Sequence, residues 1–208
     1  MKNDNGLIEE RWNTYSHASG ILLGSIGLFI LLKDVSKSEL TLPIIVYSLS
    51  IILLFSASTA YHAVTNPKIK RQLRVLDHIS IYYLIAGTYT PVCLWILADS
   101  KGILLLWLVW GIAFFGTVLK LFFTGKFEVF SLLLYGVMGW LIVIDVSYLV
   151  QHMSSDSVFY LALGGGFYTV GMGVYAIKKI RFNHFIWHLF VLGGALSHWL
   201  MIYNLSSK

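Results

Sequence analysis

The stretch HFIWHLFVLGGALSHWLMIYN, residues 184–204, contains no Asp, Glu, Lys or Arg and is long enough to cross a bilayer as one helix. Two imidazoles, His184 and His188, stand four residues apart at its start, and His198 lies ten residues beyond His188. On a helix, residues four apart leave the same face, about 6 Å from each other along the axis. Polar rings are costly to desolvate without partners, so this pair requires a chemical explanation.

Similar apolar stretches recur along almost the whole chain of 208 residues. Hydrophobic residues make up 57% of it and charged residues 12%, about half of the roughly 25% that soluble domains carry. We therefore predict an all-α integral membrane protein, a bundle of seven transmembrane helices. After a short polar segment at 1–13, the single domain 14–204 has its spans at about 14–33, 41–63, 75–98, 102–123, 129–150, 157–177 and 184–204.

The distribution of basic residues predicts the orientation of these spans. An odd number of spans places the two ends of the bundle's chain on opposite sides of the membrane. With connections such as TNPKIKRQLR (65–74) taken as loops, eleven Lys and Arg lie on the N-terminal side and four, including Lys37 and Lys208, on the other. Because basic residues favour the cytoplasm, we expect a cytoplasmic N-terminus and an extracellular C-terminus. Basic residues confined to loops argue against nucleic acid as a partner.

Several residues have simple structural interpretations. Glycines recur in GILLGSIG, GGGFYTVGMG and VLGGA, and such glycines in membranes indicate close helix contacts. Pro91 lies within the third span, where it should remove one backbone hydrogen bond and bend the helix. We expect Asn13 to cap the first helix. Asp145 and His152, near the outer membrane surface, should be solvated.

Polar side chains from three predicted spans converge at the cytoplasmic depth of the membrane. His62 ends the second span, one turn beyond Ser58 on the same face, and Asp77 opens the third span. His184 and His188 enter from the last span at the same depth. Three neutral imidazoles plus a water make the open tetrahedral arrangement of a catalytic zinc site. Asp77 could orient that water or accept its proton, and Ser58 could support it with a hydrogen bond.

Each histidine also has a less specific interpretation. A histidine at a span end is more often an interfacial residue or an interhelical hydrogen bond, as we expect for His198, some 15 Å beyond His188. Bis-histidine haem binding needs ligands on opposite sides of a wide ring, whereas the pair in the last span points at one small ion. That span also contains no lysine that could form a Schiff base with retinal, which argues against a retinal protein. His17 could support the ligands from the first span, and His78 points about 100° away from Asp77.

Four stretches together resemble the hemolysin III family, the bacterial branch of the progestin and adipoQ receptor superfamily that includes the adiponectin receptors. They are ERWNTYSHASG (10–20), SASTAYH (56–62), LDHISIYYLIAGTYTP (76–91) and HFIWHLFVLGGALSH (184–198). The resemblance covers essentially the whole chain. It implies a seven-helix protein of the bacterial plasma membrane with one zinc ion near the cytoplasmic face. The zinc ligands match His62, His184 and His188, the water-associated aspartate matches Asp77, and the serine of the second span matches Ser58.

The wider superfamily includes alkaline ceramidases, so the resemblance implies zinc-dependent hydrolysis of an amide or ester bond in a membrane lipid. Asp77 would then be the catalytic base, and Ser58 would hold the oxyanion or the water. Three alternatives stay open. The protein could be a receptor or sensor with structural zinc, it could act in membrane-lipid homeostasis, or it could have the cytolytic activity that the family label implies. The pattern predicts no oligomeric state.

Overall fold

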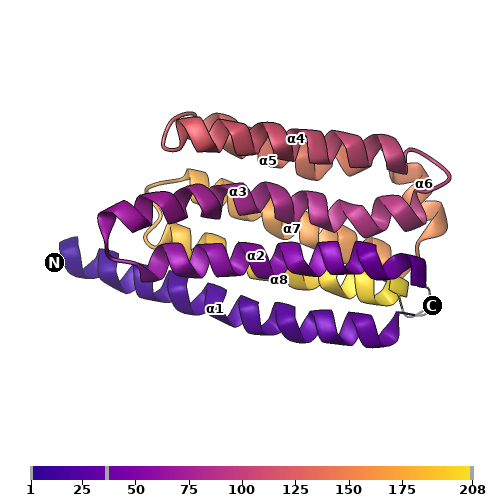
Figure 1. Cartoon of the computed structure of the whole chain (residues 1–208), viewed down its shortest axis with the longest axis horizontal. Helices are drawn as coiled ribbons and strands as arrows, with labels where there is room; N and C mark the ends of the chain where they lie inside the picture. Colours follow the sequence, from indigo (N-terminus) through magenta and orange to yellow (C-terminus); the bar gives the residue numbers. More distant parts are fainter. Residues whose placement is uncertain (1, 36–37, 207–208) are drawn as a thin grey trace.

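Seven long helices run side by side along one axis of the molecule (Figure 1). The structure, a computed structural model, describes residues 2–35 and 38–206, so Lys37 and Lys208 of the charge count lie outside it. Helix α1 begins at one end of the bundle and α8 finishes at the other (Figure 1). The predicted seven-helix membrane bundle is confirmed, and which end faces the cytoplasm stays a prediction.

All elements in the described part of the chain are helical. Their bounds are α1 Lys2–Asp34, η1 Ser38–Leu40, α2 Thr41–Ala63, α3 Pro67–Pro91, η2 Val92–Ile96, α4 Gly102–Phe123, α5 Glu128–Trp140, η3 Leu141–Asp145, α6 Val146–His152, α7 Ser155–Ala176 and α8 Asn183–Ser206. Helix α1 packs against α2 and α8, α3 packs against α2 and α4, and α7 packs against α8. Helix α5 touches α3, α4 and α7 along narrower contacts.

Helices α1 and α3 begin well before the predicted starts of their spans, at Lys2 and Pro67. Lys, Arg, Gln and Glu are good helix formers, so each helix continues into the polar sequence beyond the apolar span. The Asn66 side chain accepts hydrogen bonds from the backbone nitrogens of Lys68 (3.0 Å) and Ile69 (3.3 Å), and proline takes the first helical position. The interpretation of 65–74 as a loop was therefore wrong beyond its first residues.

Helix α1 presents one face to the bundle. Its buried positions recur every three or four residues: Asn13, His17, Gly20, Gly24, Gly27 and Leu31. Asn13 lies well inside the helix, so its predicted capping role was wrong. The buried face is polar near the start of α1 and glycine-rich further along. A Cβ atom on Gly20 would lie 2.6 Å from the Phe55 ring, which confirms that this glycine marks a close helix contact.

The fifth span is a broken helix, in which α5 gives way to the 3-10 turn η3 and then to α6. Tyr89 of α3 reaches this break. Its hydroxyl donates to the Gly139 carbonyl (2.9 Å) and accepts from the backbone nitrogen of Ile142 (2.8 Å). Because lipid offers no hydrogen-bond partners, a side chain from a neighbouring helix satisfies these backbone groups.

The sequence also led to expectations for three single residues, Pro91, Asp145 and His152. The regular α-helix of the third span ends at Pro91 and continues as a π-helical turn, Val92–Ile96. The bend expected at Pro91 stays a prediction. Asp145 is buried and accepts a hydrogen bond from the backbone nitrogen of Lys101 at 2.9 Å, so its predicted solvation was wrong. His152 is exposed, as expected.

Charged side chains connect α3, α4 and α5 at the end of the bundle where α3 begins. Glu128 of α5 lies 3.2 Å from the Arg74 guanidinium and 3.6 Å from the Lys120 ammonium. His78 Nε2 lies 3.5 Å from the same carboxylate. His78 thus belongs to this ionic cluster.

We predict that Gly20→Ala lowers the free energy of unfolding by about 1–3 kcal/mol, because the added methyl group collides with the buried Phe55 ring. A thermal melt of the purified protein in detergent measures the change. Gly166→Ala in α7 is the matched control, because no atom lies within 4 Å of a Cβ added there. This control substitution should leave the free energy of unfolding unchanged or raise it slightly. Equal melting temperatures for the two variants would contradict the close contact.

Candidate metal centre

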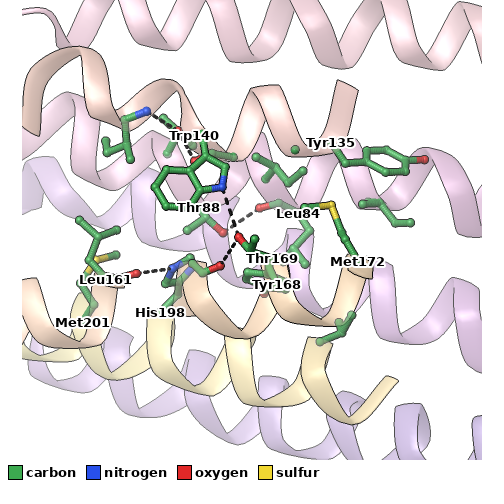
Figure 2. Close-up of a pocket in the computed structure, with 18 of the residues that line it drawn as sticks. Leu84, Thr88, Tyr135, Trp140, Leu161, Tyr168, Thr169, Met172, His198 and Met201 are labelled. Carbon is green, nitrogen blue, oxygen red and sulfur yellow. Dashed lines mark hydrogen bonds between the residues drawn. The ribbon is translucent and has the colours of Figure 1, made fainter. Parts of the chain in front are cut away.

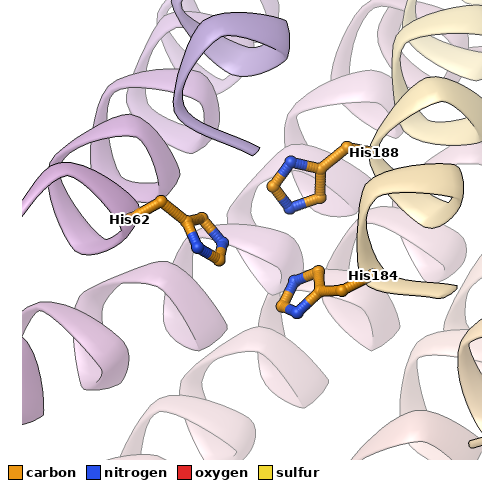
Figure 3. A group of neighbouring side chains, drawn as sticks. All are labelled: His62, His184 and His188. Atoms are coloured by element: carbon orange, nitrogen blue, oxygen red, sulfur yellow. The ribbon is translucent and has the colours of Figure 1, made fainter. Parts of the chain in front are cut away.

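Three imidazoles from two helices face one another near the end of the bundle where α1 begins (Figure 3). His62 comes from the last turn of α2, and His184 and His188 come from the first turns of α8. Their ring centroids are 4.8–5.0 Å apart, and one ring nitrogen from each lies within 4.8 Å of the others. The structure therefore brings the three predicted ligands into one group that could hold a metal ion.

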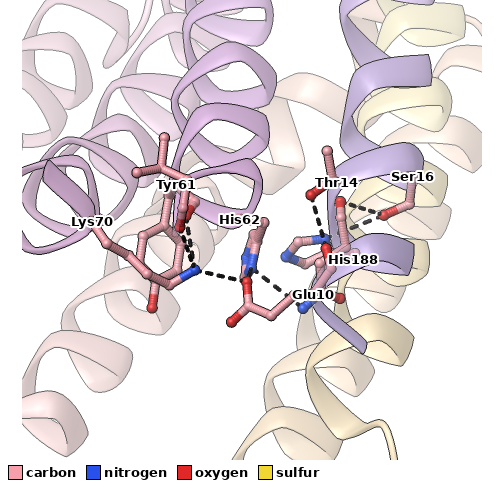
Figure 4. A network of polar contacts seen from close by, with 9 residues as sticks. Glu10, Thr14, Ser16, Tyr61, His62, Lys70 and His188 are labelled. Atoms are coloured by element: carbon pink, nitrogen blue, oxygen red, sulfur yellow. Dashed lines mark hydrogen bonds and ion pairs between the residues drawn. The ribbon is translucent and has the colours of Figure 1, made fainter. Parts of the chain in front are cut away.

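The orientation of His62 is set by Glu10 of α1. The His62 Nδ1 atom lies 2.9 Å from Glu10 Oε2, and the Lys70 ammonium lies 2.9 Å from the same oxygen (Figure 4). A carboxylate only accepts hydrogen bonds, so Nδ1 carries the proton and the lone pair is on Nε2. That Nε2 atom is buried and has no hydrogen-bond partner among the described residues. This is the arrangement in which a carboxylate orients a metal-binding histidine.

His188 is oriented in the same way by Ser16 of α1. The Ser16 hydroxyl donates its hydrogen to the Asn13 carbonyl at 3.0 Å and lies 3.3 Å from His188 Nδ1. Because that hydrogen is already used, the hydroxyl accepts from His188, whose Nε2 then carries the lone pair. Helix α1 supplies no member of the histidine group, yet it orients two of the three rings.

Asp77 and Ser58 lie together beside this group. Both side chains are buried. They line one cavity with His184 and His188. The convergence of these polar side chains, which the sequence predicted from helix position alone, is therefore present in the structure. Their chemical roles stay predictions.

The cavity has a volume of about 320 Å³ and extends from the histidine group to His198 and Met201, with mostly apolar walls. Figure 2 shows its far end, where the Trp140 indole of α5 donates a hydrogen bond of 3.2 Å to the Thr169 hydroxyl of α7. Trp140 is also exposed on the outer surface of the bundle. A chain-like apolar ligand would fit this space with its polar group near the histidines.

The remaining histidines have different surroundings. His198 Nε2 lies 3.4 Å from the Leu161 carbonyl of α7, which confirms the predicted interhelical hydrogen bond (Figure 2). His17 of α1 is buried, and its ring stacks on His188 with 3.5 Å between centroids and 11° between planes. His17 thus touches a member of the histidine group, as a supporting residue would.

The sequence analysis missed the orienting residues Glu10 and Ser16. A signal for Glu10 was present, because Glu10, Asn13 and His17 are spaced by three and four residues and share one helical face. The predicted helix began at residue 14, which removed Glu10 and Asn13 from that face. No pattern in the sequence pointed to Ser16, whose role depends on the position of α8.

The donor set suits a zinc ion. Zinc accepts neutral imidazole nitrogens readily, and three protein ligands leave one position open in its preferred tetrahedral geometry. The unpaired Nε2 atom of His62 is costly to bury without a partner, and a cation among the three rings would satisfy it. The residues present therefore fit a zinc ion.

Comparisons with known proteins give matches along nearly the whole chain. A family model described as Haemolysin-III related matches residues 5–199. The chain is 39% identical over 190 residues to hemolysin-3 of Bacillus cereus, covering 90% of this chain and 87% of that protein. It is 41% identical over 190 residues to the hemolysin-3 homolog of Bacillus subtilis (strain 168), covering 90% and 89%. Identity to the monocyte to macrophage differentiation factor of Homo sapiens is 30% over 208 residues, covering 94% and 84%.

We predict that Glu10→Ala weakens binding of a divalent cation by about 10–100-fold, because His62 loses the partner that orients it. Titration of the metal-free protein with Zn²⁺ measures the affinity. Glu9→Ala, which removes the adjacent carboxylate from the same helix, should leave the affinity close to wild type. Equal affinities for both variants would show that Glu10 does not orient a cation ligand.

Proposed function

The chain belongs to the haemolysin-III-related family of multi-pass bacterial membrane proteins, and we propose that it is a zinc-dependent hydrolase of an amide or ester bond in a membrane lipid. One observation carries the proposal. Three imidazoles, of which His62 and His188 are buried and oriented by α1, lie with the buried Asp77 carboxylate at one end of an apolar cavity. Metal ligands, a base and space for a lipid chain are the parts that such a reaction requires.

His62, His184 and His188 would hold the zinc ion. When bound, zinc supplies Lewis acidity, which activates water and polarises a carbonyl group. Glu10 and Ser16 occupy the Nδ1 atoms of His62 and His188, so that Nε2 would be the atom available to bind the ion. Because these hydrogen bonds hold the rings from outside the histidine group, little reorganisation would be needed on binding.

Asp77 is the proposed general base. Its carboxylate is buried on the cavity wall, where it would take a proton from the attacking water and pass it to the leaving amine or alcohol. Ser58 lies beside that carboxylate and would hold it in position with a hydrogen bond. The carboxylate then keeps one oxygen free for the water.

The apolar part of the cavity is the proposed site for the lipid chain. Its volume of about 320 Å³ is at the small end of the range of ligand pockets. The scissile carbonyl would lie near the histidines and the hydrocarbon would extend toward His198. The distribution of basic residues predicts that the reaction takes place near the cytoplasmic leaflet.

A second candidate function is that of a receptor or sensor in which zinc is structural. The observation that favours it is the cross-linking of three helices, because α1, α2 and α8 all contribute to the histidine group and its hydrogen bonds. A cation there would hold the three helices together whether or not it took part in a reaction.

We predict that Asp77→Asn retains about one zinc ion per chain and lowers lipid hydrolysis by roughly 10²–10⁴-fold, because the base is lost while the ligands stay. His184→Ala should lose both zinc and turnover. Metal analysis of the purified proteins and a panel of amide and ester lipids provide the measurements.

Two results would count against the hydrolase. The first is wild-type protein with full zinc that turns over no lipid in the panel. The second is dye leakage from liposomes without hydrolysis, which would favour a cytolytic activity like that named for the Bacillus cereus relative.

Chelation separates the catalytic from the structural role of the ion. We predict that a chelator lowers the melting temperature of the wild type, because the folded state loses a bound ligand, and that His188→Ala no longer responds to it. Asp77→Asn should melt close to the wild type and respond to the chelator like it. A large destabilisation by Asp77→Asn, without turnover in the wild type, would favour the structural role.

A further inference from the structure

His17 is a fourth imidazole in contact with the histidine group, and neither its burial nor its position is explained by the three proposed ligands. We propose that His17 donates a hydrogen bond to the oxygen atom at the open position of the cation, first that of water and then that of the substrate carbonyl. The inference rests on the proposed function, because it requires a cation among His62, His184 and His188. Helix α1 would then contribute a side chain that contacts a reacting oxygen atom.

The first argument is that the His17 ring is buried without partners. The residue is 3% exposed, and neither Nδ1 nor Nε2 has a hydrogen-bond partner in the part of the chain that the structure describes. A neutral imidazole carries one N–H donor and one lone pair, and leaving both unpaired away from water is unfavourable. The ring lines the cavity with Asp77 and Ser58. A group bound at this end of the cavity would supply the missing partner.

The second argument is that the ring is held in one orientation. It stacks on His188 at 3.5 Å and 11°, and it meets the Phe55 ring edge-on at 5.0 Å and 78°. Phe55 in turn packs against Gly20, one turn along α1, where no larger residue fits. A side chain fixed between two rings is preorganised to direct a hydrogen bond at one point.

The third argument distinguishes a hydrogen-bond donor from a fourth ligand. The lone pair of an imidazole nitrogen lies in the ring plane, so two parallel rings 3.5 Å apart cannot both direct lone pairs at the same ion. By contrast, His62 and His184 are steeply inclined to His188, at 72° and 85°. An atom displaced to one side of the ion can lie in the plane of His17. An oxygen bound at the open position of the cation would be such an atom.

The proposed hydrogen bond would stabilise the negative charge that forms during the reaction. During attack on an amide or ester, negative charge develops on the carbonyl oxygen, and a fixed N–H donor aimed at that oxygen stabilises it. A neutral imidazole can do this without gaining or losing a proton. The contact would also orient the attacking water before the substrate binds.

The test uses the cobalt-loaded protein and acetohydroxamate, whose oxygens bind an open metal position. His17→Phe keeps the ring stack and removes both nitrogens, and His17→Gln restores an N–H group. We expect His17→Phe to bind one Co²⁺ per chain with a shifted visible spectrum and to bind acetohydroxamate about tenfold more weakly than the wild type. His17→Gln should recover part of that affinity. His152→Phe makes the same change at an exposed histidine outside the cavity and should match the wild type.

Two results would overturn the inference and leave the proposed function standing. If His17→Phe matches the wild type in spectrum and hydroxamate affinity, His17 is only a packing residue. If it no longer binds Co²⁺ while His17→Gln does, His17 is a ligand. Wild-type protein that binds neither Zn²⁺ nor Co²⁺ would overturn the proposed function and this inference together.

Discussion

An imidazole inside an apolar bundle must find its hydrogen-bond partners within the protein, because the lipid offers none. The geometry of the histidine group follows from how this requirement is met. Glu10, itself paired with Lys70, accepts a hydrogen bond from Nδ1 of His62, and the Ser16 hydroxyl accepts one from Nδ1 of His188. Each bond leaves the opposite ring nitrogen free to face its neighbours. The helix that contributes no proposed ligand therefore decides how the ligands point.

Helix α1 can orient these rings because the residues on its inward face change from polar side chains to glycines along the helix. Near its start the face carries Asn13 and His17, with the half-exposed Glu10 at its edge, and one turn further it carries Gly20, which lets α1 approach Phe55 of α2 closely. The close approach holds the polar groups at a fixed depth beside the cavity. Helices that lie far apart in the sequence thus share one polar layer, while the rest of the cavity remains apolar.

Much of the fold could be predicted from the sequence. The seven spans, most of the glycine contacts and the shared face of His184 and His188 follow from hydropathy and helical period, which are properties of short segments. The predicted contacts were wrong for Gly165, Gly166 and Gly173, where no atom lies within 4 Å of an added Cβ. Predictions were wrong where polar or charged residues suggested a non-helical segment or a solvated side chain. Polar sequence before the first and third spans was taken for non-helical chain, and Asp145, a charged residue near a span end, was taken for a solvated one.

Composition and spacing by themselves determined that this chain crosses a membrane seven times and that three histidines, Asp77 and Ser58 lie at one depth. Only the tertiary structure decided which ring nitrogens are free, which residues orient them and that His17 stacks on His188. The physical reason is that depth and helix face depend on the local repeat of one helix. Hydrogen-bond partners and ring stacking depend on the rotation of each helix against its neighbours, and that rotation is set by packing between segments distant in the sequence.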